Sequence, residues 1–556
     1  MLPAPKDINC YDYLKECTSI YGDVYMMQHF GVKYRKSEIL RDMEALASYF
    51  QNDLGLKQGD VYTVFMPTTV QSIIAFYALN SIGVIVNMIH PLMSTDYLKE
   101  QLEVVHAKGV MILDLLSKDH VKTINDSGLP CLVCRSSDYS NGVKKYGTKI
   151  GEALIKGIFP KFRNATYYKK ALNYNKKPVF STNNADETAV YLNGGGTTGK
   201  SKTIKLTSRA INELVYRVSD LDEIHDPGNE AEVIVLPLFH CFGLCVAVHM
   251  ALCNSARIIP MMQFNARIFI NLMKKNTVVG IVGIPLMFQK LMRQKGFDGP
   301  HLKNMRIMFC GGDDVSEGFI QEFNTYFEKW GSSARLRQGY GLTEIASVCC
   351  TNTNNDNLDG SIGKALRGVN IEIWDENCKP VPNGTVGEIV ISGPTIMSGY
   401  YTDGEEADDY GLYTDENGVK WVLSGDLGYK DDNGYYHFSG RKKRLILIAG
   451  YNVYPTDIEK SVGDLPFIKE CCAVQGYNEN GKPLVRLYAS LLEKGDEEKY
   501  KEEICELCLK TFSKYYVPRD IIFVDELPQT PLMKIDFMKL TKADAEKARQ
   551  TGKIED

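Results

Sequence analysis

The sequence predicts an α/β protein with a large N-terminal domain and a small, mobile α+β C-terminal domain. The chain has 556 residues, enough for about three to four domains or subdomains of ordinary size. Apolar, strand-like runs alternate with amphipathic, helix-like runs over much of the chain, which is typical of βαβ units and mostly parallel sheets. Past residue 360, short strands punctuated by Asn-Gly and Gly-Pro turns predict a β-rich subdomain.

The strand–helix alternation can be followed in order along the chain. Apolar runs at 60–67 and 84–89 flank a helical run at 70–83. A run at 231–239 precedes a helical run at 245–252, and runs at 276–285 and 305–312 each lead into a helical run, at 286–295 and 316–330. The uncharged stretch 233–256 contains Pro237 and polar residues, so we interpret it as a strand, a turn and a helix and expect no transmembrane helix.

The composition is that of an ordinary globular protein. Hydrophobic residues make up 44% and charged residues 24%, and 64 Lys and Arg against 69 Asp and Glu give a net charge of −5. This balance argues against a body that coats nucleic acid, and we expect no nucleic-acid partner. The first residues, MLPAPKDINCYDYLKEC, lack the pattern of a signal peptide, so we expect a cytoplasmic protein with free thiols.

Two C-x-x-C pairs occur among the 15 cysteines, Cys131/Cys134 and Cys505/Cys508. Such pairs are found in zinc and redox sites. One pair lies in a strand-like run and the other in a helix-like run, and they are remote in sequence. We therefore interpret both pairs as free thiols.

The segment 156–177 combines seven Lys and Arg with five aromatic residues and no Asp or Glu. It is a candidate for peripheral contact with anionic lipid or for steering an anionic ligand. The alternative is a solvated surface excursion between core elements.

A glycine-rich loop predicts a phosphate site. In AVYLNGGGTTGKSKTIKLTSRAI, a run of three glycines, a pair of threonines and three lysines follow an apolar strand. Residues 194–201 fit the Walker A pattern, in which Lys200 and Ser201 would serve the phosphates and Mg²⁺ of an NTPase. A Walker A loop opens directly into a helix, whereas here TIKLT alternates like a strand and a helix begins only near Ser208. This context favours a mobile loop between two strands.

Four further motifs follow in order: QGYGLTE at 338–344, SGDLG at 424–428, GRKKRLILIAGYNVYP at 440–455 and QTPLMKID at 529–536. Together with GGGTTGKSK, they resemble the motifs of the adenylate-forming ANL superfamily, the AMP-dependent synthetases and ligases. The resemblance is to acyl- and aryl-CoA ligases and covers nearly the whole chain. It implies domains at 1–440, for ATP and acid binding, and at 441–556, which moves.

The resemblance implies an acid–thiol ligase that uses ATP, Mg²⁺ and CoA. An acid and ATP would give acyl-AMP and pyrophosphate, and acyl-AMP and CoA would give acyl-CoA and AMP. A hydrophobic carboxylic acid, fatty or aryl, is the expected substrate. The alternatives are a stand-alone acyl-AMP ligase that loads a carrier protein, a Walker-type P-loop NTPase, and a non-catalytic AMP-binding relative.

The same resemblance assigns roles to individual residues. Lys534, Thr343, Glu344 and His240 are the implied catalytic residues, with Glu344 also the Mg²⁺ ligand. His240, Gly311 and Gly312 are expected to border the acid pocket, and Lys443 is the implied hinge. The implied cofactor-binding residues are Thr197, Thr198, Gly199, Lys202, Gln338, Gly339, Tyr340, Gly341, Leu342, Asp426, Arg441 and Gly450.

The residue types suit this chemistry. Attack of a carboxylate on ATP gathers negative charge at the α-phosphate, so donors and cations must be aimed there. Asp426 can accept from two ribose hydroxyls, and Arg441 can offer a planar fork to ribose or phosphate. The chain departs from the family pattern at Met533, where glycine usually precedes the catalytic lysine, and at Leu447, where several relatives carry a lysine.

Overall fold

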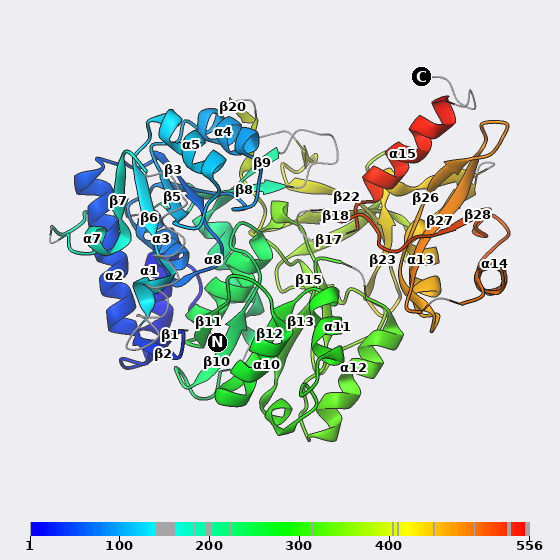
Figure 1. The fold of residues 1–556 in the computed structure, drawn as a ribbon, viewed down its shortest axis with the longest axis horizontal. Coiled ribbons are helices and arrows are strands. Elements are labelled where there is room, and N and C mark those ends of the chain that lie inside the picture. Colours follow the sequence, from blue (N-terminus) through cyan, green and yellow to red (C-terminus); the bar gives the residue numbers. More distant parts are fainter. Residues whose placement is uncertain are drawn as a thin grey trace.

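The computed structural model describes most of the chain in two unequal bodies, a large one and a small C-terminal one (Figure 1). The described residues are 2–140, 162–174, 176–182, 184–194, 202–221, 224–313, 315–402, 405–407, 411–448, 451–493, 495–530 and 535–550.

Sheet 1 of the large body has a parallel centre and antiparallel edges. Strands β14, β13, β12, β10, β11 and β1 pair in parallel, and β16, β15 and β2 add antiparallel edges. In spatial order the strands are β16 (Lys364–Ala365), β15 (Cys350–Thr351), β14 (Arg337–Tyr340), β13 (Ile307–Cys310), β12 (Thr277–Gly283), β10 (Glu230–Ile234), β11 (Arg257–Pro260), β1 (Tyr25–His29) and β2 (Val32–Arg35).

Sheet 2 repeats this design. Strands β8, β4, β3, β5, β6 and β7 pair in parallel, and β9, β19 and β20 continue the sheet in antiparallel fashion. In spatial order the strands are β20 (Glu405–Ala407), β19 (Gly399–Thr402), β9 (Lys202–Thr207), β8 (Thr188–Gly194), β4 (Ile85–Met88), β3 (Val61–Phe65), β5 (Val110–Leu113), β6 (Cys131–Cys134) and β7 (Ala165–Tyr167).

Helices fill the space between the sheets and cover their outer faces, so the large body is layered. The main core lies between the sheets and includes α1 (Cys10–Thr18), α2 (Lys36–Ser48), α3 (Val70–Ser81), α8 (Ser208–Val218), the π-helix Phe242–Met250 and α9 (Ala251–Cys253). A second core packs α4 (Thr95–Val104) and α5 (Lys118–Ser127) on sheet 2. A third packs α10 (Ala266–Lys275), α11 (Pro285–Arg293) and α12 (Glu317–Lys329) on sheet 1.

Helix α3 shows why the sequence folds this way. Thr69 caps it by accepting from the Ser72 N–H, and every residue from Val70 to Ser81 is buried. A mostly apolar helix that is buried on every side has to be enclosed, and α1, α2 and strands β3 and β4 of sheet 2 pack against it.

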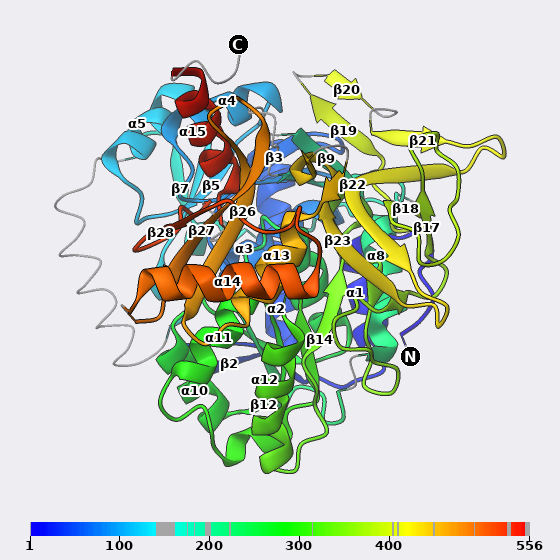
Figure 2. The same cartoon turned by 90° about the vertical axis from the view of Figure 1, so that its right-hand side faces the viewer.

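Two smaller parts complete the chain. Sheet 3 is antiparallel and consists of β17 (Asn370–Trp374), β18 (Gly387–Ser392), β22 (Lys420–Lys430), β21 (Leu412–Thr414) and β23 (Tyr436–Arg441). The C-terminal body has a core of its own and contains β24 (Ile446–Ile448), β25 (Tyr451–Val453), α13 (Pro455–Gly463), β26 (Ile468–Tyr477), β27 (Pro483–Leu491), α14 (Glu497–Thr511), β28 (Asp520–Phe523) and α15 (Phe537–Gln550). Figure 2 shows α14 and α15 on this body.

The predicted fold class is confirmed: an α/β body with mostly parallel sheets, a β-rich part and a smaller C-terminal domain. The cysteines are free, with Cys131 and Cys134 in β6 and Cys505 and Cys508 in α14. Within the described ranges, no group of three or more metal-binding side chains occurs, and no helix has the length and apolarity needed to cross a bilayer.

The basic aromatic segment 156–177 is only partly described. Residues 156–161 lie outside the described residues, and α7 (Tyr168–Ala171) packs into the core. The Tyr168 hydroxyl lies 3.1 Å from that of Tyr139, and both rings are buried. Tyr168 is therefore a core residue, and lipid contact by the rest of the segment stays a prediction.

Candidate active site

The predicted site residues of sheet 1 follow the ends of neighbouring parallel strands. Because β10, β12, β13 and β14 pair in parallel, their carboxyl ends meet at one edge. His240 follows β10, Gly311 follows β13, and Thr343 follows β14. Ligands of open α/β sheets bind at this edge.

The loop Gly341–Ser347 is tight and strained. A Cβ added at Gly341 would lie 1.5 Å from the carbonyl oxygen of Ser347, so only glycine fits there. Ala346 and Ser347 adopt φ values of 61° and 144°, which L side chains rarely adopt. Backbone strain of this kind persists where the surroundings hold it in place. Here the two strained residues directly follow the 3₁₀ turn Thr343–Ile345, so the same surroundings fix that turn at the edge of the sheet.

Glu344 accepts hydrogen bonds from the segment Met397–Tyr400, which no predicted motif includes. The Tyr400 hydroxyl donates to Glu344 Oε1 at 2.9 Å, and the Met397 N–H donates to the Glu344 carbonyl at 2.7 Å. The half-buried carboxylate forms no ion pair with a basic side chain of the described residues. A carboxylate in this state fits Mg²⁺, which binds one or two protein carboxylates together with phosphate oxygens.

Thr343 contacts a residue that sequence reasoning missed. The Cys241 thiol donates to Thr343 Oγ1 at 3.5 Å. Burial raises the pKa of Cys241 to about 11, so the thiol remains a donor. The sequence offered one sign of this contact, the position of Cys241 next to His240. That position is equally consistent with ordinary packing.

Tyr340 and Arg441 both lie in contact with Asp426. Asp426 lies opposite Arg441 in the β22–β23 register, and the Arg441 Nε is 3.0 Å from Asp426 Oδ1. The Tyr340 hydroxyl donates to Asp426 Oδ2 at 2.7 Å, and the Asp426 side chain is 2% exposed. Burial, and the Asp426 carboxylate, raise the pKa of Tyr340 well above its usual range, so the hydroxyl stays protonated.

Gln338 and Gly339 lie in β14, with Gly341 and Leu342 just beyond it. The Gln338 carbonyl accepts from the Asn352 N–H at 3.0 Å, so this end of β14 is tied to the strand beside it. The motif QGYGLTE, predicted to bind the nucleotide, is therefore a strand end and its turn at the edge of sheet 1.

His240 is held by the chain around it. The Phe242 N–H donates to His240 Nδ1 at 3.2 Å, so a neutral ring carries its proton on Nε2. Sheet 2 fixes the same loop: Thr68 Oγ1 donates to the Leu236 carbonyl at 3.0 Å and accepts from the Leu238 N–H at 3.2 Å. The two sheets therefore share the positioning of His240.

Gly311 and Gly312 lie between apolar side chains. A Cβ at Gly311 would meet the Phe242 ring at 3.4 Å, and one at Gly312 would meet Ile284 at 3.5 Å. Gly312 also has a φ of 81°, which favours glycine. The predicted acid pocket therefore has apolar walls on this side.

The glycine-rich loop joins two antiparallel strands. Gly194 at the end of β8 pairs with Lys202 at the start of β9, and α8 begins only at Ser208. The Walker alternative is therefore wrong, because its loop would open into a helix. Thr197, Thr198 and Gly199, with Lys200 and Ser201, lie outside the described residues, and the role of Lys202 stays a prediction.

The predicted hinge lies between two anchors. Lys442 Nζ is 2.8 Å from Glu388 of β18 in the large body. Arg444 pairs with Glu459 of α13 and donates to the Ala473 carbonyl at 3.1 Å, both in the C-terminal body. Lys443 lies between them. Gly450 and Lys534 are outside the described residues.

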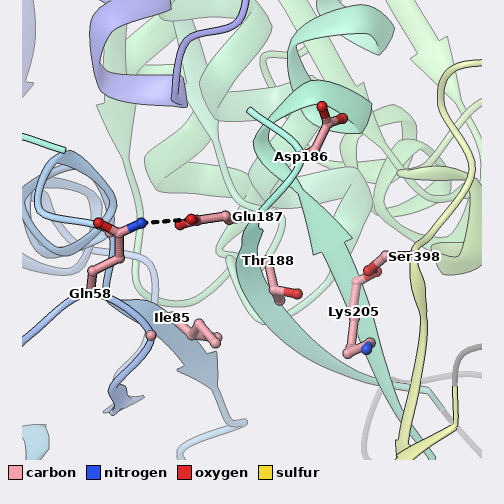
Figure 3. A pocket seen from close by; sticks show the side chains of 9 residues that line it. Gln58, Ile85, Asp186, Glu187, Thr188, Lys205 and Ser398 are labelled. Atoms are coloured by element: carbon pink, nitrogen blue, oxygen red, sulfur yellow. Dashed lines mark hydrogen bonds between the residues drawn. The ribbon is translucent and has the colours of Figure 1, made fainter. Parts of the chain in front are cut away.

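Two cavities lie away from these residues. One of about 480 Å³ opens where β4 and β8 begin, at Ile85 and Thr188, the opposite end of these strands from the glycine-rich loop (Figure 3). There Gln58 donates to Glu187 at 2.6 Å. The second, about 230 Å³, separates Ser316 of the large body from Lys460 of the C-terminal body. Neither contains a predicted site residue.

Comparison with known proteins decides the family. The model of the AMP-binding enzyme matches residues 26–401, and that of the AMP-binding enzyme C-terminal domain matches residues 457–534. The chain belongs to the AMP-binding enzyme family. The prediction of an AMP-forming acid–thiol ligase that uses ATP, Mg²⁺ and CoA is confirmed at the level of this family.

This AMP-binding enzyme is similar to several characterised proteins. It is 27% identical to a long-chain-fatty-acid–CoA ligase of Escherichia coli O6:H1, over 94% of this chain and 92% of that protein. It is 26% identical to a long-chain-fatty-acid–CoA ligase of Bacillus subtilis, over 98% and 96%. Its fold is that of the anthranilate CoA ligase AuaEII solved with anthranoyl-AMP, with a TM-score of 0.80, 18% identity and 99% of both chains covered.

Proposed function

We propose that this AMP-binding enzyme is an ATP-dependent ligase that joins a hydrophobic carboxylic acid to CoA through an acyl-adenylate. The observation that supports this most directly is that three kinds of group gather where the carboxyl edge of sheet 1 meets sheet 3. Tyr340, Asp426 and Arg441 form a polar cluster, Thr343 and Glu344 lie in a fixed loop, and Gly311 lies against an apolar wall. These are the parts needed to bind a nucleotide, stabilise charge at a phosphate and admit an apolar acid.

In the first step, the acid's carboxylate attacks the α-phosphate of ATP, a bond forms between them, and pyrophosphate leaves with its electron pair. The Thr343 hydroxyl donates to the phosphate oxygens, and Lys534 supplies a cation there. Asp426 accepts from the ribose hydroxyls. Glu344 would hold Mg²⁺, which when bound would neutralise charge on the phosphate oxygens. His240 borders the acid's carboxylate.

The second step replaces AMP with a thiol, and the attacking sulfur loses its proton as the thioester forms. Lys534 has to clear the space that the thiol enters, so we propose that residues 441–556 rotate on residues 1–440 about Lys443. Lys442 and Arg444, anchored in different bodies, support this pivot. Gly450 would let the backbone approach the thiol's chain.

A hydrophobic acid is supported by the walls and by the relatives. Phe242 and Ile284 face the two glycines of the pocket, and the methyl group of Met287 lies 1.9 Å from a Cβ built on Gly283 at the end of β12. The Escherichia coli and Bacillus subtilis relatives are named for long-chain fatty acids.

An acid panel with ATP, read as pyrophosphate release with and without CoA, tests the proposal. Saturated fatty acids of increasing length and simple aryl acids should each give pyrophosphate release with or without CoA. They should give AMP and thioester only with CoA. Malonate and succinate serve as polar controls. A preference for the dicarboxylates would overturn the hydrophobic pocket. Thioester formation on a phosphopantetheinyl carrier but not on CoA would favour the carrier-loading alternative.

A further inference from the structure

The segment Met397–Tyr400 holds Glu344 at two points. The Met397 N–H donates to the main-chain carbonyl of Glu344, which fixes where the residue lies. The Tyr400 hydroxyl donates to Glu344 Oε1 at 2.9 Å, which fixes how the carboxylate is turned. The two residues of this side-chain bond are 56 positions apart in the sequence, so only the fold brings them together.

Tyr400 is itself held firmly. It is 6% exposed, and its backbone in β19 pairs with Ile204 of β9. A Cβ added at Gly411 would lie 2.9 Å from the Tyr400 ring, so the backbone at Gly411 packs against that ring. A hydroxyl on a ring packed in this way is a preorganised donor, since little freedom is lost when it bonds.

The strand that carries this contact also adjoins the phosphate loop. Strand β9 begins at Lys202, directly after the glycine-rich loop, and β19 pairs along it. A single antiparallel pair of strands therefore connects the end of that loop with the side chain that orients Glu344.

We infer that Tyr400 is a positioning residue for the metal-bound nucleotide. Its hydroxyl occupies Oε1 of Glu344, and Oε2 has no hydrogen-bond partner in the part of the chain that the structure describes. Tyr400 thus sets Oε2 for the metal and ties its position to the strand after the phosphate loop. The inference rests on the proposed function, in which Glu344 binds Mg²⁺.

Calorimetric titration of the full-length enzyme with ATP, with excess Mg²⁺ and again with EDTA, tests this inference. The ratio of the two ATP affinities measures how much Mg²⁺ strengthens ATP binding. Tyr400→Phe should lower this ratio by about tenfold, the loss expected for one hydrogen bond to a charged group. Its affinity for metal-free ATP should stay within about twofold of the wild type. The reason is that the variant removes a hydrogen bond to Glu344 and no contact with the nucleotide itself.

Tyr436→Phe is the matched control. Tyr436 is also buried, and its hydroxyl donates to a main-chain carbonyl, that of Ile371, at 2.7 Å. This variant should keep the wild-type ratio, and urea unfolding should show all variants folded. A Tyr400→Phe ratio equal to that of the wild type, or an equal loss in both titrations, would overturn the inference.

Glu344→Gln separates the inference from the proposed function. Loss of the Mg²⁺ enhancement in Glu344→Gln, with no further loss in the Tyr400→Phe/Glu344→Gln double variant, is the expected result. If Glu344→Gln keeps the full enhancement, Glu344 is not the metal ligand and the proposed role fails. If Glu344→Gln loses it and Tyr400→Phe keeps it, only the role of Tyr400 fails.

Discussion

The loop Gly341–Ser347 and the turn Arg441–Arg444 both bring side chains to the candidate site, but the structure secures them in opposite ways. The side-chain contacts of the Thr343–Glu344 pair come from the large body, through Cys241 and Tyr400. The loop also carries strained backbone, which its surroundings hold in place. It is built to stay still.

The turn, in contrast, divides its contacts within four residues. Arg441 and Lys442 pair with acidic residues of sheet 3, whereas Arg444 pairs with Glu459 of the C-terminal body. Although burial opposes its charge, the carboxylate of Glu459 and, more weakly, that of Asp313 raise the pKa of Arg444. A charge-stabilising loop gains from rigidity, and a pivot needs its two sides attached to different bodies.

Removing the C-terminal anchor of the turn should have the largest effect. Arg444→Met leaves the largely buried carboxylate of Glu459 without its cation, and we expect the free energy of unfolding to fall by about 3 kcal/mol. Lys442→Met, whose ion pair with Glu388 is half exposed, should cost less than about 1 kcal/mol. Urea denaturation measures both. Equal losses would show that the two anchors do not differ.

Gly341→Ala should break the fixed loop. The new Cβ would collide with the Ser347 carbonyl oxygen, so the turn with Thr343 and Glu344 has to shift. A displacement of about 1 Å lowers rates by about 100-fold, and acid-dependent pyrophosphate release measures this loss. Gly22→Ala is the control, because nothing lies within 4 Å of its Cβ. Unchanged release in Gly341→Ala would mean that the loop is not preorganised.

Lys443→Pro should block the proposed pivot without touching the loop Gly341–Ser347. Proline holds φ near −65°, so the variant should keep acid-dependent pyrophosphate release and lose about tenfold or more of thioester formation. Lys443→Ala, which leaves φ free, should keep both. The measurement is thioester output from supplied acyl-AMP and CoA. A wild-type rate in Lys443→Pro would place the pivot elsewhere or remove the need for rotation.

Cys241→Ala should show the smallest effect. Loss of one weak thiol hydrogen bond to Thr343 lowers pyrophosphate release by about threefold. Cys245→Ala, a buried thiol of the neighbouring π-helix, should lose similar stability with no rate change. Comparison of kcat for the two variants checks this. Equal rates would make Cys241 a packing residue only.

Much of the element order was predictable because it depends on local patterns. The alternating TIKLT run predicts a strand after the glycine-rich loop, and the structure has β9 there, with α8 beginning at Ser208 as expected. The motifs place Tyr340 and Asp426 in one site, and the structure has them in contact, while their role toward a nucleotide stays a prediction. Tyr168 was not correctly placed, because basic neighbours made its segment look solvated while its ring packs into the core.

The sequence by itself determined the fold class, much of the order of the elements and the family, because periodicity and motif spacing are properties of neighbouring residues. The roles that its motifs assign to single residues stay predictions. Only the tertiary structure decided what holds these residues. Three sets of contacts join segments far apart in the chain. They are the hydrogen bond from Tyr400 to Glu344, the hydrogen bond from Cys241 to Thr343, and the ion pairs on either side of Lys443. Such contacts depend on how two sheets and a second body pack together, and no local pattern specifies that packing.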